Sequence, residues 1–143
     1  MKQIKFVLCI VVCIPMIFSC SCGFFGDQRY ICTSENVQSI QIVSLDKYVE
    51  GEYRYEYTVL CEIGDISKFV KELNSLEQSV NWGDPLQLDI GYVVIRIEYT
   101  NGDYDLLYNN AQWFNHSGVN QAGFFFFDEK QFNTLISNYY IAE

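Results

Sequence analysis

The chain has 143 residues, of which 50% are apolar, 17% aromatic and 19% charged. This composition excludes a disordered tail, a collagen-like repeat and a coiled coil, and it allows one globular domain with a hydrophobic core. The net charge of -9 argues against a nucleic-acid partner, because phosphates bind basic surfaces. The single histidine, His116, cannot form a multi-histidine metal site within one chain, and we expect neither a metal nor a cofactor.

The first residues carry a targeting signal. Lys2 and Lys5 precede an uncharged apolar run at 6–18, the pattern of a secretory signal peptide. A membrane-spanning helix requires about 20 apolar residues, so this run is too short, and Pro15 lies inside it. An uncleaved anchor helix that continues to Phe25 is the alternative.

A cysteine motif follows the apolar run. Residues 17–20, Ile-Phe-Ser-Cys, resemble a lipobox, the motif of bacterial lipoproteins in which a small residue precedes the lipidated cysteine. The resemblance covers only the first twenty residues. It implies a signal peptide at 1–19, a palmitate-type lipid anchor on Cys20, and a location on the bacterial cell envelope outside the cytoplasm. Cys22 is the alternative acceptor, and an ordinary signal peptide is the alternative to the lipobox.

The rest of the chain is expected to form a tether followed by one domain. Residues 20–36 show no sustained periodicity and are expected to be the tether, with 37–143 as a single globular domain. A strand is predicted over 37–45. The clearest strand covers 53–63, where apolar and polar residues alternate with period two, and 46–52 is the expected hairpin connection.

A helix and a second hairpin are predicted next. Asp65 is placed to cap a helix, and apolar residues then recur at spacings of three and four up to Leu76. Residues 78–88 contain Gly-Asp-Pro and are predicted to form a loop. The segment 91–100 returns to period two, and the Asn-Gly pair at 101–102 favours a type I′ hairpin turn.

The returning strand of this hairpin is expected over 103–109. Its alternation places Asp103 and Asp105 on a solvated face. The polar residues 109–123 are predicted to form a loop.

The last elements complete an order of ββα-βββα. Residues 124–127 are four phenylalanines, long enough for a buried strand, and Asp128 then begins a second amphipathic helix with Gln131 in capping-box register. Hairpins favour an antiparallel sheet, and two apolar helix stripes must be buried. We therefore predict a two-layer α+β domain in which an antiparallel sheet of about five strands carries both helices on one face, with the other face in solvent.

Cysteines and histidine are weak candidates for chemistry. An exported protein permits a disulfide between Cys32 and Cys61, and a buried free thiol at Cys61 is the alternative. His116 is the one histidine available to a serine or cysteine nucleophile, and it lies in a predicted surface loop beside Ser117. We therefore assign no catalytic residue.

Aromatic residues in predicted loops are the strongest candidates for binding. Trp82 and the pair Trp113 and Phe114 lie next to glycine and asparagine, and His116 belongs to the same loop as the pair. Exposed aromatic side chains are typical anchors for a protein, peptide or glycan partner. The alternative is that these rings cover the core.

These features predict a membrane-anchored envelope lipoprotein, most simply a non-enzymatic binding module that attaches to the membrane through its N-terminal lipid. The loops at 78–88 and 109–123 would contact the partner. A small extracytoplasmic hydrolase or thiol enzyme around Cys32 or Cys61, and a structural envelope protein, are the alternatives.

Overall fold

The computed structural model describes residues 29–80, 86–123 and 125–141. The predicted signal peptide, Cys20, Cys22 and Trp82 lie outside these residues. Within the described ranges, no helix combines the length and the apolar character needed to cross a bilayer.

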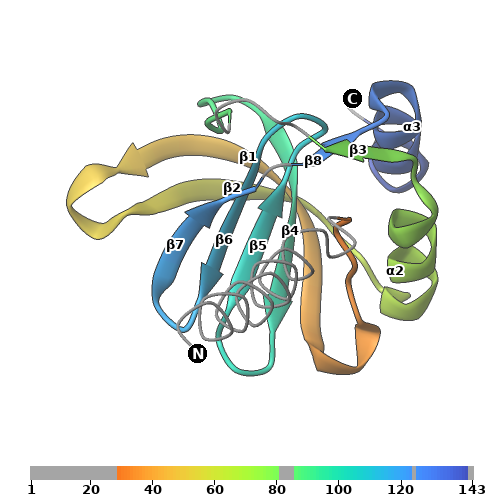
Figure 1. The fold of residues 1–143 in the computed structure, drawn as a ribbon, viewed down its shortest axis with the longest axis horizontal. Helices are drawn as coiled ribbons and strands as arrows, with labels where there is room; N and C mark the ends of the chain where they lie inside the picture. The colour runs from red at the N-terminus through yellow and green to blue at the C-terminus, as the bar shows by residue number, and fades with distance from the viewer. Residues whose placement is uncertain (1–28, 81–85, 124, 142–143) are drawn as a thin grey trace, which may run out of the picture.

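The described chain is an α+β protein built on a six-stranded antiparallel sheet (Figure 1), in the order β2-β1-β4-β5-β6-β7. The strands of this sheet are β1 (Val37–Val49), β2 (Arg54–Glu62), β4 (Val93–Tyr99), β5 (Tyr104–Leu107), β6 (Gln112–His116) and β7 (Val119–Ala122). The other elements are β3 (Gln78–Val80), β8 (Phe125–Phe127), α2 (Ile66–Ser75), α3 (Glu129–Tyr139), and the 3-10 turns η1 (Ser34–Asn36) and η2 (Glu50–Glu52).

Both predicted helix caps are confirmed. The Asp65 carboxylate accepts a hydrogen bond from the Lys68 backbone N–H at the start of α2, and Asp128 accepts one from Gln131 at the start of α3. The capping box at α3 is not reciprocal. The Gln131 side chain instead accepts the backbone N–H of Glu77, so it joins the helix to the chain just before β3.

The predicted Asn-Gly hairpin is present with a different turn. Tyr99 donates its backbone N–H to the carbonyl of Asp103, which closes a three-residue loop over 100–102. Gly102 has a positive φ of 86°, whereas Asn101 is not among the residues with positive φ. A type I′ turn requires positive φ at both central residues, so this hairpin is of the three-residue kind.

Two predicted loops contain strands. The segment 78–88 includes β3, which pairs with β8 in a separate two-stranded sheet, and 109–123 includes β6 and β7. Ser117 and Gly118 connect β6 to β7 with φ angles of 54° and 74°, the signature of a type I′ turn. The large sheet therefore has six strands where about five were predicted.

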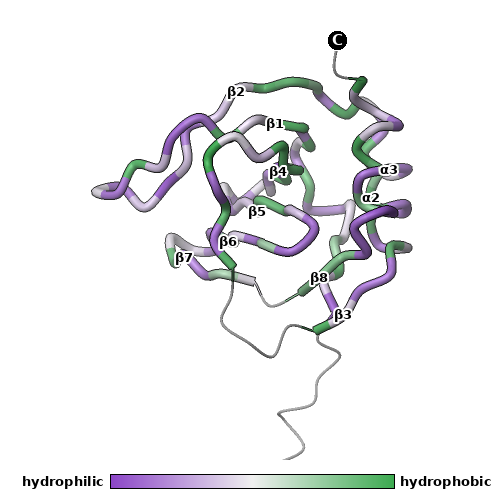
Figure 2. Tube along the Cα trace, turned by 90° about the horizontal axis from the view of Figure 1, so that it is seen from above, coloured by the Kyte–Doolittle hydropathy of each residue, from purple (hydrophilic) through white to green (hydrophobic). Residues whose placement is uncertain are grey.

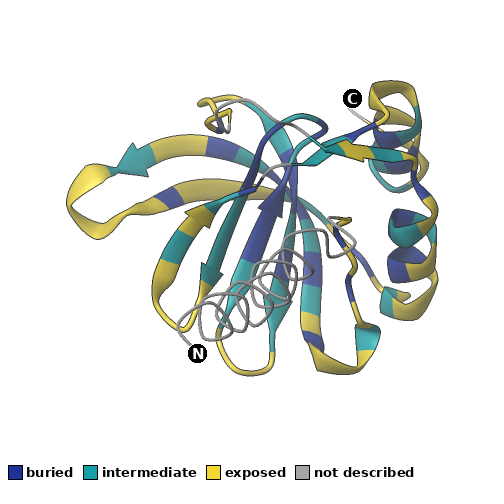
Figure 3. Ribbon diagram, viewed as in Figure 1, coloured by how far each residue is buried: buried dark blue, intermediate teal, exposed yellow. Residues whose placement is uncertain are grey.

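Helices α2 and α3 lie beside each other on one face of the large sheet, as predicted (Figure 2). Apart from Tyr30 and Cys32, the buried side chains of this core cluster are aliphatic or phenylalanine, and dark blue marks buried residues in Figure 3. They include Ile40, Ile42, Ile95, Ile97 and Leu107 from the sheet, and Phe69, Leu73, Phe132 and Leu135 from the helices.

The opposite face of the sheet was predicted to lie in solvent, and this prediction is wrong. It carries a second buried cluster that contains Val43, Leu45, Tyr55, Leu88, Val94 and Leu106. Two register shifts interrupt the pairing of β1 with β2, and such bulges bend and twist strands. The sheet curls, and the Asn120 side chain on β7 donates to the carbonyl of Tyr53 beside β2, which links the two edges. The inner face is thereby enclosed.

Candidate functional site

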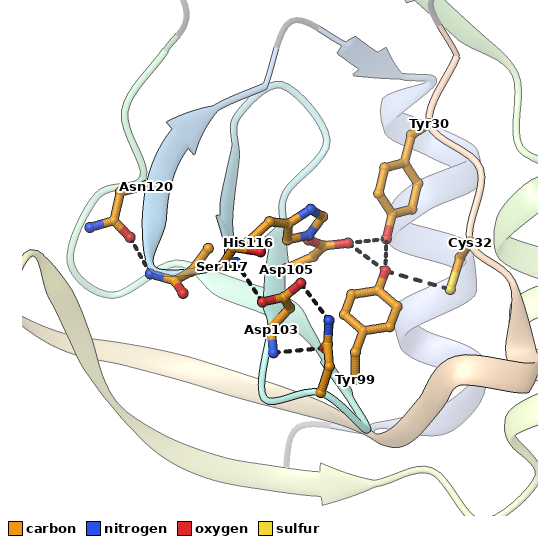
Figure 4. Close-up of polar contacts among 10 residues, drawn as sticks. Tyr30, Cys32, Tyr99, Asp103, Asp105, His116, Ser117 and Asn120 are labelled. Carbon is orange, nitrogen blue, oxygen red and sulfur yellow. Dashed lines mark hydrogen bonds and ion pairs between the residues drawn. The ribbon is translucent and has the colours of Figure 1, made fainter.

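A buried carboxylate lies at the centre of a polar network that joins three other side chains. Asp105 on β5 is 1% exposed. Its Oδ2 accepts hydrogen bonds from the hydroxyls of Tyr30 at 2.7 Å and Tyr99 at 2.6 Å, and its Oδ1 lies 2.7 Å from Nε2 of His116 (Figure 4). The prediction that Asp105 faces solvent is therefore wrong.

Strand pairing brings three of these side chains together. Asp105 pairs with Ile97 on β4 and with Phe114 on β6. Tyr99 and His116 each lie two residues further along their strands, so alternation places them on the same face as Asp105, in diagonal positions. This face is the one that carries the helices.

The fourth side chain comes from the segment 29–33, which precedes β1. The backbone N–H and carbonyl of Tyr30 bond the side-chain amide of Gln78, at 2.8 and 3.0 Å. Those of Cys32 bond the amide of Asn74 in the same way, at 2.9 and 2.7 Å. Tyr30 and Cys32 are buried, so the end of the expected tether is fastened to the folded body.

The two tyrosines of the network keep their protons. Burial, followed by the charge of Asp105, raises the pKa of Tyr30 well above its ordinary value. Burial and the hydrogen bond to Asp105 likewise raise the pKa of Tyr99. Both phenols therefore stay protonated and donate to the carboxylate, as a buried ion requires.

A second carboxylate fixes the neighbouring turns. The two oxygens of Asp103 accept the backbone N–H of Ser117 at 2.7 Å and the side-chain amide of Asn101 at 2.8 Å. The bond from Ser117 is the main cause that lowers the pKa of Asp103. The carboxylate is therefore ionised at neutral pH, and it ties the β6–β7 turn to the β4–β5 turn.

These turns and the 29–33 segment surround an open pocket of about 400 Å³, which we call the His116 pocket. Its lining includes Ile31, Thr33, Asn36 and Tyr99, with His116 contributing an imidazole whose side chain is 54% exposed. Because Asp105 holds one ring nitrogen, the imidazole has a fixed orientation at the pocket. His116 is thus at a strand end beside a pocket, whereas a surface loop was predicted.

The predicted aromatic anchors lie in strand β6 and contact other rings. Trp113 packs edge-on against Tyr48 and Tyr55 in the second buried cluster, with centroid distances of 6.3 and 5.9 Å. Phe114 points to the other face and stacks on Tyr30 at 5.9 Å. Their positions favour the alternative that these rings cover the core.

The two described cysteines are free thiols, so the expected bond between Cys32 and Cys61 is not formed in the structure. Cys32 is 3% exposed and its sulfur lies 4.0 Å from the Tyr99 hydroxyl, while burial raises the pKa of the thiol. Cys61 is half-buried, and its sulfur lies 3.4 Å from the carbonyl of Tyr139.

Sequence reasoning missed Tyr30, Tyr99 and Asp105 as members of one site. The Ser-Gly dipeptide at 117–118 was an available hairpin signal that would have revealed β6 and β7. No family model matches the chain, and neither the curated proteins nor the solved structures give a match.

Proposed function

We propose that this chain is a lipoprotein of the bacterial cell envelope, anchored through Cys20, and that its folded domain is a non-enzymatic binding module. The observation that supports binding is the His116 pocket, in which a buried carboxylate orients a half-exposed imidazole. Binding sites for small molecules combine a concave surface of this size with a few fixed polar groups. The partner is a protein, a peptide or a glycan of the envelope.

The geometry favours binding over thiol catalysis. A nucleophilic cysteine requires a thiolate and a base within hydrogen-bond reach. Burial raises the pKa of Cys32, and its sulfur contacts the Tyr99 hydroxyl. The hydrogen-bond partner of the His116 ring among the described residues is Asp105, so the imidazole is oriented without a nucleophile beside it.

The attachment of Tyr30 limits how far the domain can move from the lipid. With Cys20 lipidated, only residues 20–28 separate the anchor from the folded body. At about 3.5 Å per residue these residues span roughly 30 Å when fully extended. Since the 29–33 segment forms one wall of the His116 pocket, the proposed ligand is bound close to the membrane surface.

The anchor is tested by the intact mass of the protein extracted from membranes, beside Cys20→Ser and Cys22→Ser variants. We expect a chain that begins at Cys20 and carries acyl mass, lost in Cys20→Ser and retained in Cys22→Ser. Loss only in Cys22→Ser would move the acceptor to that residue. An unmodified chain that retains residues 1–19 would contradict the lipoprotein proposal.

The binding role is tested by photo-crosslinking in cells from two exposed isoleucines. Ile31 borders the His116 pocket and is 66% exposed, and Ile141 follows α3 and is 83% exposed. We expect a discrete adduct from a photoreactive residue at position 31 and none from position 141. Equal labelling from both positions, or no adduct, would favour a structural envelope protein.

A further inference from the structure

We propose that the His116 pocket takes a hydroxyl-rich ligand, a saccharide; this inference rests on the binding function proposed above. Three properties of the pocket support it: the orientation of the imidazole, an ionised Asp103 with no lysine or arginine in the described lining, and the mixed polar and apolar walls.

The first property is the orientation of His116. Oδ2 of Asp105 accepts the two tyrosine hydroxyls, and Oδ1 lies 2.7 Å from Nε2 of the imidazole. This contact leaves Nδ1 as the other polar atom of a ring with a fixed orientation. A hydroxyl both donates and accepts, so a ligand hydroxyl can pair with Nδ1 whether or not that nitrogen carries a proton.

The second property is the charge of the pocket. Asp103 lines it and is ionised, and the described residues of the lining include neither lysine nor arginine. An anionic ligand would therefore meet a negative charge with no cation to balance it. Each oxygen of Asp103 accepts one neutral N–H group, and a carboxylate oxygen can accept a second donor, so Asp103 can also accept a hydroxyl of the ligand.

The third property is the chemistry of the walls. Thr33 and Thr100 bring hydroxyls and Asn36 brings an amide, which together supply donors and acceptors. Tyr99 adds an aromatic ring, and Ile31 adds an exposed aliphatic surface. A pyranose has hydroxyls around its edge and C–H groups on its faces, so it matches this combination.

The test is calorimetric titration of the full membrane-extracted protein with a β-1,4-linked N-acetylglucosamine tetramer, maltotetraose, spermidine and inorganic phosphate. We expect at least one saccharide to bind.

His116→Phe should weaken that binding about tenfold and Asn36→Ala about fivefold, the effects of one lost hydrogen bond each. Val119→Ser, at an exposed position on the β6–β7 hairpin outside the pocket lining, should leave it unchanged. Thermal unfolding of each variant checks the fold, and Asn36→Ala keeps the test valid if His116→Phe unfolds.

Three results would overturn the inference: saccharide binding that persists in both pocket variants, spermidine or phosphate binding that depends on His116, or the absence of saccharide binding. If no saccharide binds while crosslinking from position 31 still yields an adduct, the ligand class is wrong and the binding proposal stands. If both experiments fail, both proposals fail.

Discussion

The two faces of the large sheet are both buried, but by different means. The helix-covered face is closed by aliphatic and phenylalanine side chains from α2 and α3, such as the fully buried Phe69 and Phe132. Within the described ranges no helix covers the inner face, and tyrosine and tryptophan side chains fill much of it. Tyr55 donates its hydroxyl to the carbonyl of Leu88, and Trp113 contacts Tyr55 from across the curled sheet.

This difference shows how one layer of helices can suffice for a sheet with two apolar faces. A curled sheet brings its own strands opposite each other, and large aromatic rings span the distance between them. On this face Arg96 lies over the rings of Tyr57 and Tyr104, at 5.0 and 5.4 Å from the two ring centroids. Each face holds a charged side chain at one point, Arg96 on the inner face and the buried Asp105 on the helix-covered face.

The largest effect is expected on the helix-covered face. Phe132→Ala removes a fully buried ring between α3 and the sheet, and we expect it to lower the free energy of unfolding by about 3–5 kcal/mol. The measurement is urea denaturation followed by circular dichroism. Val119→Ala, at a 65% exposed position, is the control and should change stability by less than about 0.5 kcal/mol.

A smaller loss is expected on the inner face. Trp113→Ala should cost about 2–3 kcal/mol, because the ring is half-buried and contacts Tyr48 and Tyr55. The same denaturation experiment measures it. Unchanged stability together with lost capture of a partner would instead make Trp113 a binding anchor and contradict the second core.

At the margin of the helix-covered face, Asp105→Asn tests the polar network. We expect a loss of about 2 kcal/mol, since hydrogen bonds from two tyrosines and a histidine lose their charged acceptor. Asp103→Asn is the matched control, because its carboxylate serves the more exposed turns, and its loss should be clearly smaller. Equal losses of stability in the two variants would show that the burial of Asp105 adds nothing to the free energy of unfolding.

The smallest expected effect is a gradual loss of stability at alkaline pH. Burial raises the pKa of Tyr30 in the folded state above its ordinary value near 10, so the folded chain holds a proton that the unfolded chain releases. Stability is therefore complete below pH 10 and falls as pH rises above it, by about 1.4 kcal/mol per pH unit for this tyrosine. Urea denaturation from pH 9 to 11.5 measures the slope, and Tyr30→Phe should reduce it. An identical slope in the variant would mean that Tyr30 ionises as freely as in the unfolded chain.

Local signals were sufficient to predict several elements correctly. Asp65 and Asp128 cap their helices because a carboxylate three residues from an N–H needs no distant partner. The hairpin at 101–102 also formed, although its turn type depended on the registration of β4 with β5. The strands β3, β6 and β7 were missed because they are short and contain polar residues without a clear alternation of apolar side chains.

Asp103 and Asp105 show which features follow from the sequence and which require the tertiary structure. The sequence alone determined that both lie on the segment that returns from the Asn-Gly turn, since alternation and turn chemistry act between near neighbours. Alternation assigned both carboxylates to the same solvated face, so the sequence did not distinguish them. Only the tertiary structure buried Asp105, by pairing β5 with β6 and by placing Tyr30, 75 residues away in the sequence, over its carboxylate. Burial depends on which distant segments cover a position, and the periodicity of one strand contains no information about them.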